Sequence, residues 1–192
     1  MNIKTLDTDY LYWYRENFFS SKERKKIVSS INKNYIQVEP HNSGAATLEG
    51  VSKKKSKTLM IPWGKLKGVT RDLESIINLD NELHFGYNIF PMNDHSYVLL
   101  NIYSSEEKGE YDWHTDTSKS PFNETKLTAL VNLSESYEGG DFLIFDGGAI
   151  KIDVFKPGTL LIIKSHLNHK VEPVTKGTRK TLTIFRHGPR LR

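Results

Sequence analysis

Cysteine is absent from the 192 residues of the chain, which excludes disulfide bonds and thiolate metal sites. No apolar run approaches the roughly 18 residues that a membrane-spanning helix needs. The N-terminal residues lack the uncharged apolar stretch of a secretion signal. There are neither low-complexity segments nor repeats with a period of about 20 to 50 residues. We therefore expect a single domain over residues 1–192, in the cytoplasm and without a membrane partner.

Charge of one sign is only slightly in excess, with 27 Lys and Arg against 23 Asp and Glu. The 37% hydrophobic and 26% charged residues are typical of a globular protein, so intrinsic disorder is not expected. Most of the positive excess lies in the segment Lys53–Lys57. Such a run indicates a solvated loop, or else a surface that steers an anionic partner. It is too short to indicate a nucleic-acid partner.

Helical periodicity is confined to the N-terminal part of the chain. One of two adjacent serines can cap a helix over residues 21–32, and apolar residues recur at helical spacing over residues 69–79. Residues 40–68 are rich in Gly, Ser and Lys and show little periodicity. We therefore expect residues 1–83 to form a helical support that includes a long, mobile loop.

Short β segments separated by turns follow from residue 84 onward. Asp146-Gly147-Gly148 favours a hairpin because these residues tolerate a positive φ. Short strands at regular spacing, preceded by helices, indicate a double-sheet jelly roll of the α+β class. We therefore expect a mainly β fold, a cupin-like double-stranded β-helix over residues 84–192 with N-terminal supporting helices. The expected strands are 84–90, 97–103, 111–116, 126–133, 141–145, 149–153, 159–163, 169–174 and 179–186.

The pattern with the clearest chemistry is a histidine and an aspartate two residues apart, His114 and Asp116. Residues at this spacing share one face of a strand, so the two side chains project together. Two histidines compete to complete the site. His166 lies in a connection, whereas His169 begins a predicted strand and shares the face of the apolar Val171, which favours His169. Two histidines and one carboxylate leave open positions on iron(II), and this ligand set is typical of oxygen-activating sites.

Arg179 follows His169 by ten residues and adds a fixed cation. The planar guanidinium offers two parallel donors to a carboxylate, which suits a dicarboxylate co-substrate better than lysine does. Each piece of this pattern occurs by chance in many proteins. The ordered combination within a jelly-roll pattern indicates a metal site with an organic anion beside it.

Four stretches carry a resemblance to a known family. They are Tyr111–Asp116, Glu138–Phe142, Lys156–Leu160 and His169–Arg179, the last with the pattern H-x-V-x-P-V-x-x-G-x-R. These stretches resemble the iron(II)/2-oxoglutarate dioxygenases of the prolyl 4-hydroxylase type, in particular their small microbial and phage branch. The resemblance covers residues 97–187, about half of the chain.

The resemblance implies that His114, Asp116 and His169 are the catalytic iron(II) ligands. It also implies 2-oxoglutarate and O₂ as co-substrates and ascorbate as an accessory reductant. The implied reaction couples the decarboxylation of 2-oxoglutarate to succinate with hydroxylation of an unactivated C–H bond. Because Asp116 leaves no ligand position for a halide, hydroxylation is favoured over halogenation. The implied substrate is a prolyl or other residue of a peptide or protein, or a free amino acid.

Three further residues receive roles in binding the co-substrate. The resemblance implies that Arg179 holds the distal carboxylate of 2-oxoglutarate. Tyr103, which precedes His114 by 11 residues, would direct its hydroxyl to the same carboxylate, or else be a packed strand aromatic. Thr181 shares a strand face with Arg179 and would add a hydroxyl to the pocket.

Two alternatives to this function remain. The same chemistry could act on a nucleotide or another small metabolite, with the Lys53–Lys57 segment as an anion funnel. The chain could instead be a non-catalytic, metal-binding jelly-roll module. Arg179 argues against the module, because a plain metal site does not need a carboxylate clamp.

The sequence departs from those of related enzymes at two places, and each departure limits which of their properties the resemblance implies for this chain. Residues 127–133 contain no aromatic residue where some peptidyl-prolyl hydroxylases carry a tyrosine, so animal-type substrate specificity does not carry over. Nucleic-acid demethylases of the superfamily carry the pattern R-x-N-x-T-x-R. Here Thr181 replaces the asparagine and Arg186 comes one place late. Nucleic-acid repair is therefore not expected.

Overall fold

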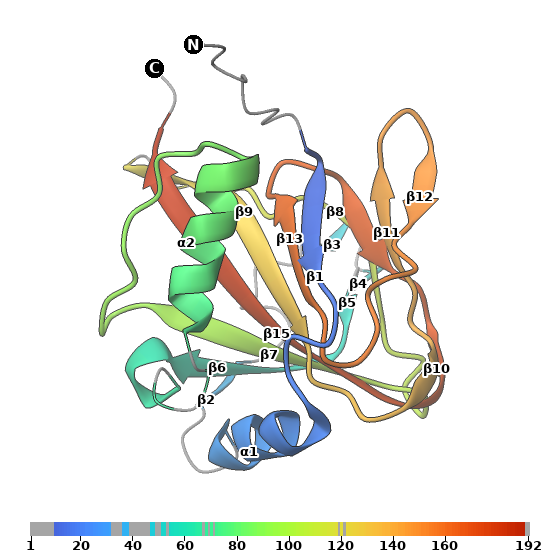
Figure 1. Cartoon of the computed structure of the whole chain (residues 1–192). Helices are drawn as coiled ribbons and strands as arrows, with labels where there is room; N and C mark the ends of the chain where they lie inside the picture. The colour runs from blue at the N-terminus through green and yellow to red at the C-terminus, as the bar shows by residue number, and fades with distance from the viewer. Residues whose placement is uncertain are drawn as a thin grey trace.

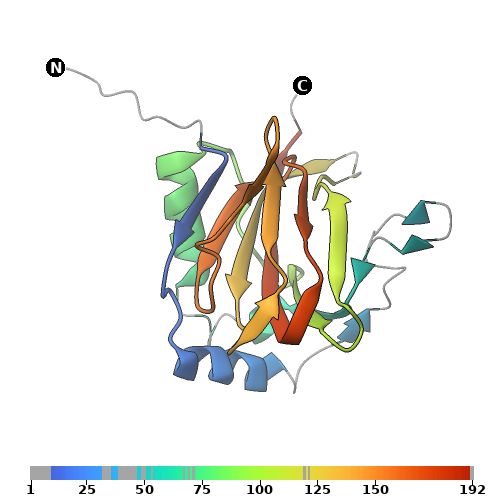
Figure 2. The same cartoon turned by 90° about the vertical axis from the view of Figure 1, so that its right-hand side faces the viewer.

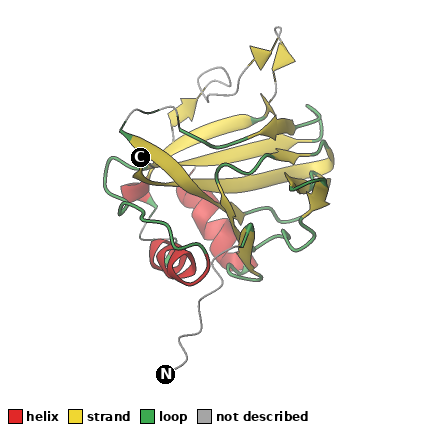
Figure 3. Cartoon of the chain, turned by 90° about the horizontal axis from the view of Figure 1, so that it is seen from above, coloured by secondary structure: helices red, strands yellow, loops and turns green. Residues whose placement is uncertain are grey.

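Two β-sheets face each other in the computed structural model, and both helices pack on the outer face of the larger sheet (Figure 1; Figure 2). Seen from above, the helices lie on one side of the sheets only (Figure 3). The structure describes residues 10–31, 36–38, 47–48, 51–52, 54–66, 68, 70, 72–118, 120 and 122–190. Among these residues, no helix has the length and apolar character that crossing a membrane requires.

The strands are β1 Tyr12–Arg15, β2 Ile36–Val38, β3 Thr47–Leu48, β4 Val51–Ser52, β5 Lys54–Lys55, β6 Lys57–Pro62, β7 Tyr97–Ser104, β8 Glu110–His114, β9 Asn123–Asn132, β10 Tyr137–Gly139, β11 Phe142–Phe145, β12 Ala149–Lys151, β13 Leu160–Lys164, β14 His169–Val171 and β15 Val174–Pro189. The helices are α1 Ser21–Ile31, α2 Leu73–His84 and the 3-10 helix η2 Trp63–Lys65. The larger sheet has the order β1-β13-β9-β15-β7-β6-β2, with β10 paired to β15. The smaller sheet has the order β12-β11-β14-β8-β5, and β3 pairs with β4.

Side chains alternate between the two faces of the larger sheet, as the period of a strand requires. On β15, Leu182 and Ile184 belong to the core that packs against the helices. Thr181 and Thr183, which alternate with them, line a pocket between the two sheets. The predicted fold is confirmed: a mainly β, double-stranded β-helix with supporting helices. Polar side chains of both sheets meet in the space between the sheets.

Helix α1 begins with a capping box. The Ser20 N–H donates to Glu23 Oε2 at 2.9 Å, and the Glu23 N–H donates to Ser20 Oγ at 3.4 Å. Each side chain thus satisfies a backbone donor that the first turn leaves without a helical partner. The helix predicted over residues 21–32 is confirmed as far as Ile31; residue 32 lies outside the described residues.

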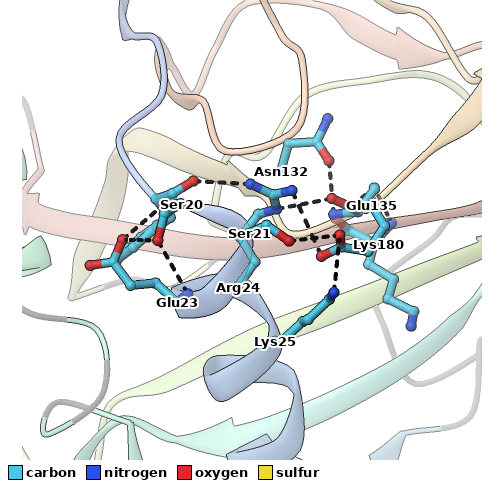
Figure 4. A network of polar contacts seen from close by, with 10 residues as sticks. Ser20, Ser21, Glu23, Arg24, Lys25, Asn132, Glu135 and Lys180 are labelled. Atoms are coloured by element: carbon cyan, nitrogen blue, oxygen red, sulfur yellow. Dashed lines mark hydrogen bonds and ion pairs between the residues drawn. The ribbon is translucent and has the colours of Figure 1, made fainter.

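A buried arginine joins α1 to the segment that follows β9 (Figure 4). Arg24 donates to the carbonyl oxygens of Phe19 and Ser134 at 3.1 and 3.0 Å. Beside it, Glu135 accepts a hydrogen bond from Ser21 at 2.9 Å. These bonds hold α1 against the segment that follows β9 of the larger sheet.

The second predicted helix is displaced, and the strand predicted for residues 84–90 is wrong. Helix α2 begins at Leu73 and continues to His84, where the prediction ended it at residue 79. Gly86 has a φ of +69°, and its N–H donates to the carbonyl of Asn81 at 2.7 Å, which is typical of a helix end. The chain then leaves the helix as an irregular segment. The residue types of 84–90 resemble those of a strand, and they do not reveal the hydrogen bond from Gly86 to Asn81 that ends the helix.

The loop predicted for residues 40–68 is wrong where β3, β4, β5, β6 and η2 lie, that is for residues 47–48, 51–52, 54–55 and 57–65. Strand β6 pairs with β7 and extends the larger sheet. Its Leu59 and Ile61 enter the core beneath the helices. Residues 40–46 of the predicted loop lie outside the described residues. Strand β1, which pairs with β13, was not predicted either.

A buried ion pair joins β1 to α2 and gives a first prediction. Arg15 donates to both carboxylate oxygens of Asp80, at 2.8 and 2.6 Å, and Asp80 is fully buried. Breaking a fully buried pair costs about 3–5 kcal/mol, and the half-exposed Arg15 side chain reduces this cost. We expect Asp80→Ala to lower the free energy of unfolding by about 2 kcal/mol, measured by chemical denaturation. The exposed pair of Lys151 and Asp141 is the control. Asp141→Ala should not shift the denaturation midpoint, and equal shifts in both variants would contradict the prediction.

Candidate active site

The three predicted iron ligands lie together between the two sheets. His114 ends β8, Asp116 follows two residues later, and His169 begins β14, where it pairs with His114. One ligand atom from each lies within 4.8 Å of the others. The Nε2 atoms of His114 and His169 lie 3.8 and 3.3 Å from the carboxylate oxygens of Asp116. His166, the alternative third ligand, is exposed and is not part of this group.

Backbone carbonyl groups orient both imidazole rings. Nδ1 of His114 lies 2.7 Å from the carbonyl oxygen of Asp112, and Nδ1 of His169 lies 2.9 Å from that of Leu167. A proton on Nδ1 leaves the lone pair on Nε2, because a neutral imidazole carries one N–H. Both Nε2 atoms lie on the side of Asp116. The tautomers that these bonds favour are therefore those that bind a metal through Nε2.

Two neighbouring side chains hold the ligands in place. Thr128 on β9 donates from Oγ1 to Oδ2 of Asp116 at 2.8 Å. The ring of Tyr111 stacks on His114, with centroids 3.4 Å apart and planes inclined by 13°. Contacts of this kind fix a ligand's direction before a metal arrives, which favours a defined geometry.

Burial and mutual contacts set the charges of the three ligands. Burial, together with His169, lowers the pKa of His114 to about 4. Burial alone would raise the pKa of Asp116, but His169, His114 and the Thr128 hydroxyl hold it below its ordinary value. Burial opposes protonation of His169, yet the Asp116 carboxylate outweighs it and raises the pKa of His169. At neutral pH His114 is neutral and Asp116 is ionised, which are the forms that bind a cation.

Arg179 reaches the same pocket from β15 and carries buried donors that find no acceptor among the described residues. The residue is 1% exposed, and its Nε and Nη2 have no hydrogen-bond partner among the described residues. The same is true of the Thr181 hydroxyl within that part of the chain. An unsatisfied buried donor costs about 1–3 kcal/mol, so these groups fit a ligand that accepts hydrogen bonds. A carboxylate accepts two parallel bonds from a guanidinium and is the anion that matches best.

Tyr103 lies beside Arg179. The two residues are paired across β7 and β15, and the guanidinium carbon lies 5.3 Å from the centroid of the Tyr103 ring. Burial raises the pKa of Tyr103 to about 12, so its hydroxyl keeps its proton and can donate. Arg179, Tyr103 and Thr181 therefore form one group of donors at one end of the pocket.

The pocket joins the ligand cluster to this group of donors. It has a cavity volume of about 80 Å³, and Leu130, Phe142 and Val171 form its apolar wall. Two imidazoles and one carboxylate form the donor set of an iron(II) site with open positions. The guanidinium and its neighbours fit a carboxylate. The residues present therefore fit iron(II) and 2-oxoglutarate together.

Several polar residues of the pocket were not predicted, Lys54 and Asn101 among them. Lys54 on β5 is 5% exposed and donates from Nζ to Oδ1 of Asn101 at 2.8 Å. Burial lowers the pKa of Lys54 to about 8, although Asp116 opposes this shift. Lys54, Ser56 and Thr58 are buried whereas Lys55 and Lys57 are exposed, but this alternation is a property of the structure that the lysine-rich sequence does not reveal.

Comparisons with known proteins agree with this site. The family model of the 2OG-Fe(II) oxygenase superfamily matches residues 98–187. This range includes His114, Asp116, His169 and Arg179. A PKHD-type hydroxylase of Idiomarina loihiensis is 34% identical over 85 residues. This match covers 43% of the chain and 38% of the relative, so the chain spans well under half of that curated protein.

Solved structures with the same fold include two prolyl hydroxylases. A Pseudomonas putida prolyl-4-hydroxylase has a TM-score of 0.69 at 13% identity, with 95% of each chain covered. A prolyl hydroxylase of Trichoplax adhaerens, in complex with a hypoxia inducible factor peptide fragment, has a TM-score of 0.63 at 17% identity, covering 93% of this chain and 84% of that one. At these identities the likeness shows the fold. Iron(II), 2-oxoglutarate and O₂ are the cofactor and co-substrates of the matched superfamily. Residues 98–187, just under half of the chain, thus match the 2OG-Fe(II) oxygenase superfamily, and the chain is similar to prolyl hydroxylase-type members of that superfamily.

Proposed function

We propose that this chain is an iron(II)/2-oxoglutarate-dependent dioxygenase that hydroxylates an unactivated C–H bond. One observation carries the proposal: a single pocket contains both the cluster of His114, Asp116 and His169 and the Arg179 donors Nε and Nη2, which have no partner among the described residues. In this proposal the three clustered residues hold iron(II). Arg179 binds the distal carboxylate of 2-oxoglutarate, with Tyr103 and Thr181 as further donors.

The residues of the pocket divide the work between them. Bound iron(II) supplies O₂ activation, with the decarboxylation of 2-oxoglutarate to succinate as the source of electrons. Arg179 would fix the direction in which the co-substrate lies, so that its other end faces the metal site formed by the three ligands. The apolar side chains of Leu130 and Phe142 limit the access of water to the reacting centre. Thr128 keeps the Asp116 carboxylate in its ligating orientation.

We further propose an amino-acid substrate: a prolyl or other residue of a peptide or protein, or a free amino acid. Two relatives support this class. The Idiomarina protein is a PKHD-type hydroxylase, and the Trichoplax prolyl hydroxylase is in complex with a peptide fragment.

A coupled product screen tests the proposed function. The protein is incubated with iron(II), ascorbate, labelled 2-oxoglutarate and a panel of prolyl peptides and free amino acids. We expect at least one member to gain one oxygen atom, with an equimolar increase in succinate above the reaction without added substrate. Hydroxylation restricted to a parallel panel of nucleotides would contradict the substrate class. Absence of succinate in every reaction would contradict the activity.

Thr128→Val provides a second prediction, because it removes the hydroxyl that donates to Asp116 while keeping the shape of the side chain. Loss of a group that orients a metal ligand lowers metal affinity by about 10- to 100-fold. We expect a decrease in this range for Mn(II), measured by calorimetry. Thr125→Val is the matched control, since Thr125 lies on the same strand and contacts His187 outside the pocket. Equal losses in the two variants, or none in Thr128→Val, would contradict the assignment.

A further inference from the structure

Two hydroxyl groups in series lead to the Asp116 carboxylate, and the proposed chemistry uses only the nearer one. Thr128 Oγ1 lies 2.8 Å from Oδ2 of Asp116, and Ser165 Oγ lies 3.1 Å from Thr128 Oγ1. Thr128 and Ser165 are both 0% exposed. Ser165 does not line the pocket, so any effect that it has on a bound metal passes through neighbouring groups.

The direction of this chain of hydrogen bonds follows from the charge of Asp116. An ionised carboxylate can only accept, so the single proton of the Thr128 hydroxyl lies toward Asp116. Thr128 Oγ1 then has only lone pairs to offer on the side of Ser165. The Ser165 hydroxyl is therefore the donor in the contact between the two hydroxyl groups. Ser165 donates to Thr128, and Thr128 donates to Asp116.

The backbone of Ser165 contacts the same ligand residue. The Asp116 N–H donates to the Ser165 carbonyl oxygen at 2.9 Å, and the Ser165 N–H donates to the carbonyl oxygen of Lys126 at 3.0 Å. Ser165 is thus fixed between β9 and the segment that contains Asp116. Two residues further on, the carbonyl oxygen of Leu167 orients the ring of His169. The short connection between β13 and β14 therefore contacts two of the three predicted metal ligands.

We propose that Ser165 is a positioning residue of the metal site, which acts on Asp116 through the Thr128 hydroxyl. This inference rests on the metal site of the proposed function and extends it by one residue. Hydrogen bonds in series polarise one another, so the Ser165 hydroxyl strengthens the bond from Thr128 to the carboxylate. It also restrains rotation of the Thr128 side chain, whose hydroxyl then has a partner on each side. Asp116 is thereby held in one orientation before a metal binds.

A double-mutant cycle tests the order of the chain. Ser165→Ala removes the hydroxyl and keeps the backbone hydrogen bonds. We expect its Kd for Mn(II), measured by calorimetry, to rise about three- to tenfold, the effect of one neutral hydrogen bond. The double variant Ser165→Ala/Thr128→Val should bind Mn(II) within about twofold of Thr128→Val alone, because Ser165 acts through Thr128.

Ser134→Ala is the matched control. Ser134 is also buried, and its hydroxyl exchanges hydrogen bonds with the backbone of Lys180 outside the pocket. This variant loses a buried hydroxyl that has no contact with the ligands, so it should bind Mn(II) like the wild type.

A spectroscopic measurement separates positioning of the ligand from a general loss of stability. The visible absorption bands of bound Co(II) depend on the geometry of its ligands. At saturating Co(II), we expect Ser165→Ala to shift these bands and Ser134→Ala to leave them unchanged. Ser165→Cys keeps a weak donor at the same position, so its shift should be smaller. Near-ultraviolet circular dichroism verifies folding, and Ser165→Cys replaces Ser165→Ala in the cycle if the alanine variant does not fold.

Three results would overturn the inference. The first is wild-type Mn(II) affinity together with an unchanged Co(II) spectrum in the Ser165 variants. The second is a double variant in which the two losses add, and the third is an equal loss in Ser134→Ala. The proposed function fails separately, if the wild type binds Mn(II) but forms no succinate when supplied with iron(II), O₂ and 2-oxoglutarate. That result would leave the role of Ser165 in the metal site intact, so either idea can fail alone.

Discussion

Replacing Asp116 with alanine should abolish metal binding by the pocket. Its carboxylate is the only anionic group among the clustered ligands, and it holds the position that both imidazole Nε2 atoms approach. Groups that merely orient a ligand contribute about 10- to 100-fold to metal affinity, so we expect the loss of a ligand to exceed about 100-fold. Calorimetric titration with Mn(II), and with iron(II) in the absence of O₂, measures this loss. An Asp116→Ala variant that binds either ion like the wild type would contradict the ligand assignment.

The same experiment distinguishes the two candidate histidines. His169→Ala should lose metal binding to a similar extent, because His169 lies in the cluster. His166→Ala is the matched control, since that ring is exposed three residues earlier in the chain. Near-ultraviolet circular dichroism verifies that each variant is folded. Retention of metal by His169→Ala together with its loss in His166→Ala would reverse the assignment.

Replacing Arg179 with glutamine should raise the Kd for 2-oxoglutarate by about 100-fold or more. Two of its buried donor atoms, Nε and Nη2, have no partner among the described residues. A hydrogen bond to a charged group contributes about 1.5–3 kcal/mol, and each 1.4 kcal/mol corresponds to about tenfold in affinity. Two such bonds to one carboxylate therefore account for the expected effect. Calorimetry with Mn(II)-loaded protein measures it.

Two variants serve as controls for Arg179→Gln. Lys180→Gln changes the neighbouring position on β15, whose side chain lies on the other face of the strand and does not line the pocket. It should bind 2-oxoglutarate like the wild type. Arg179→Lys keeps the charge but loses the planar pair of donors, so its affinity should be intermediate. Wild-type affinity in Arg179→Gln, or an equal defect in Lys180→Gln, would contradict the role of Arg179.

The strands that could be predicted from the sequence are those whose burial leaves a local pattern. Residues 126–133 and 159–163 are nearly continuous apolar runs bounded by turns, and they form the adjacent central strands β9 and β13. Strand β6 also contains an apolar run, Leu59-Met60-Ile61, but the lysine-rich segment before it led to the prediction of a loop. Strand β1 is only four residues long and depends on pairing with β13, far away in the chain. No local sequence pattern identifies such a strand.

The same distinction explains which parts of the site were predictable. His114 and Asp116 lie two residues apart, so the period of a strand places both side chains on one face. The spacing of Arg179 from His169 is also local. Lys54, in contrast, enters the pocket because β5 pairs with β8, where Lys54 lies opposite Tyr111. That contact joins segments that are distant in sequence, and a lysine in a basic run is ordinarily solvated.

The central claim is that one pocket binds iron(II) and 2-oxoglutarate and makes them react. Its most direct test is the conversion of labelled 2-oxoglutarate by the purified protein without added substrate. We expect slow formation of succinate that requires both iron(II) and O₂ and is absent in Asp116→Ala. Succinate formation that is equal in wild type and Asp116→Ala, or a wild type that neither forms succinate nor binds 2-oxoglutarate, would contradict the claim.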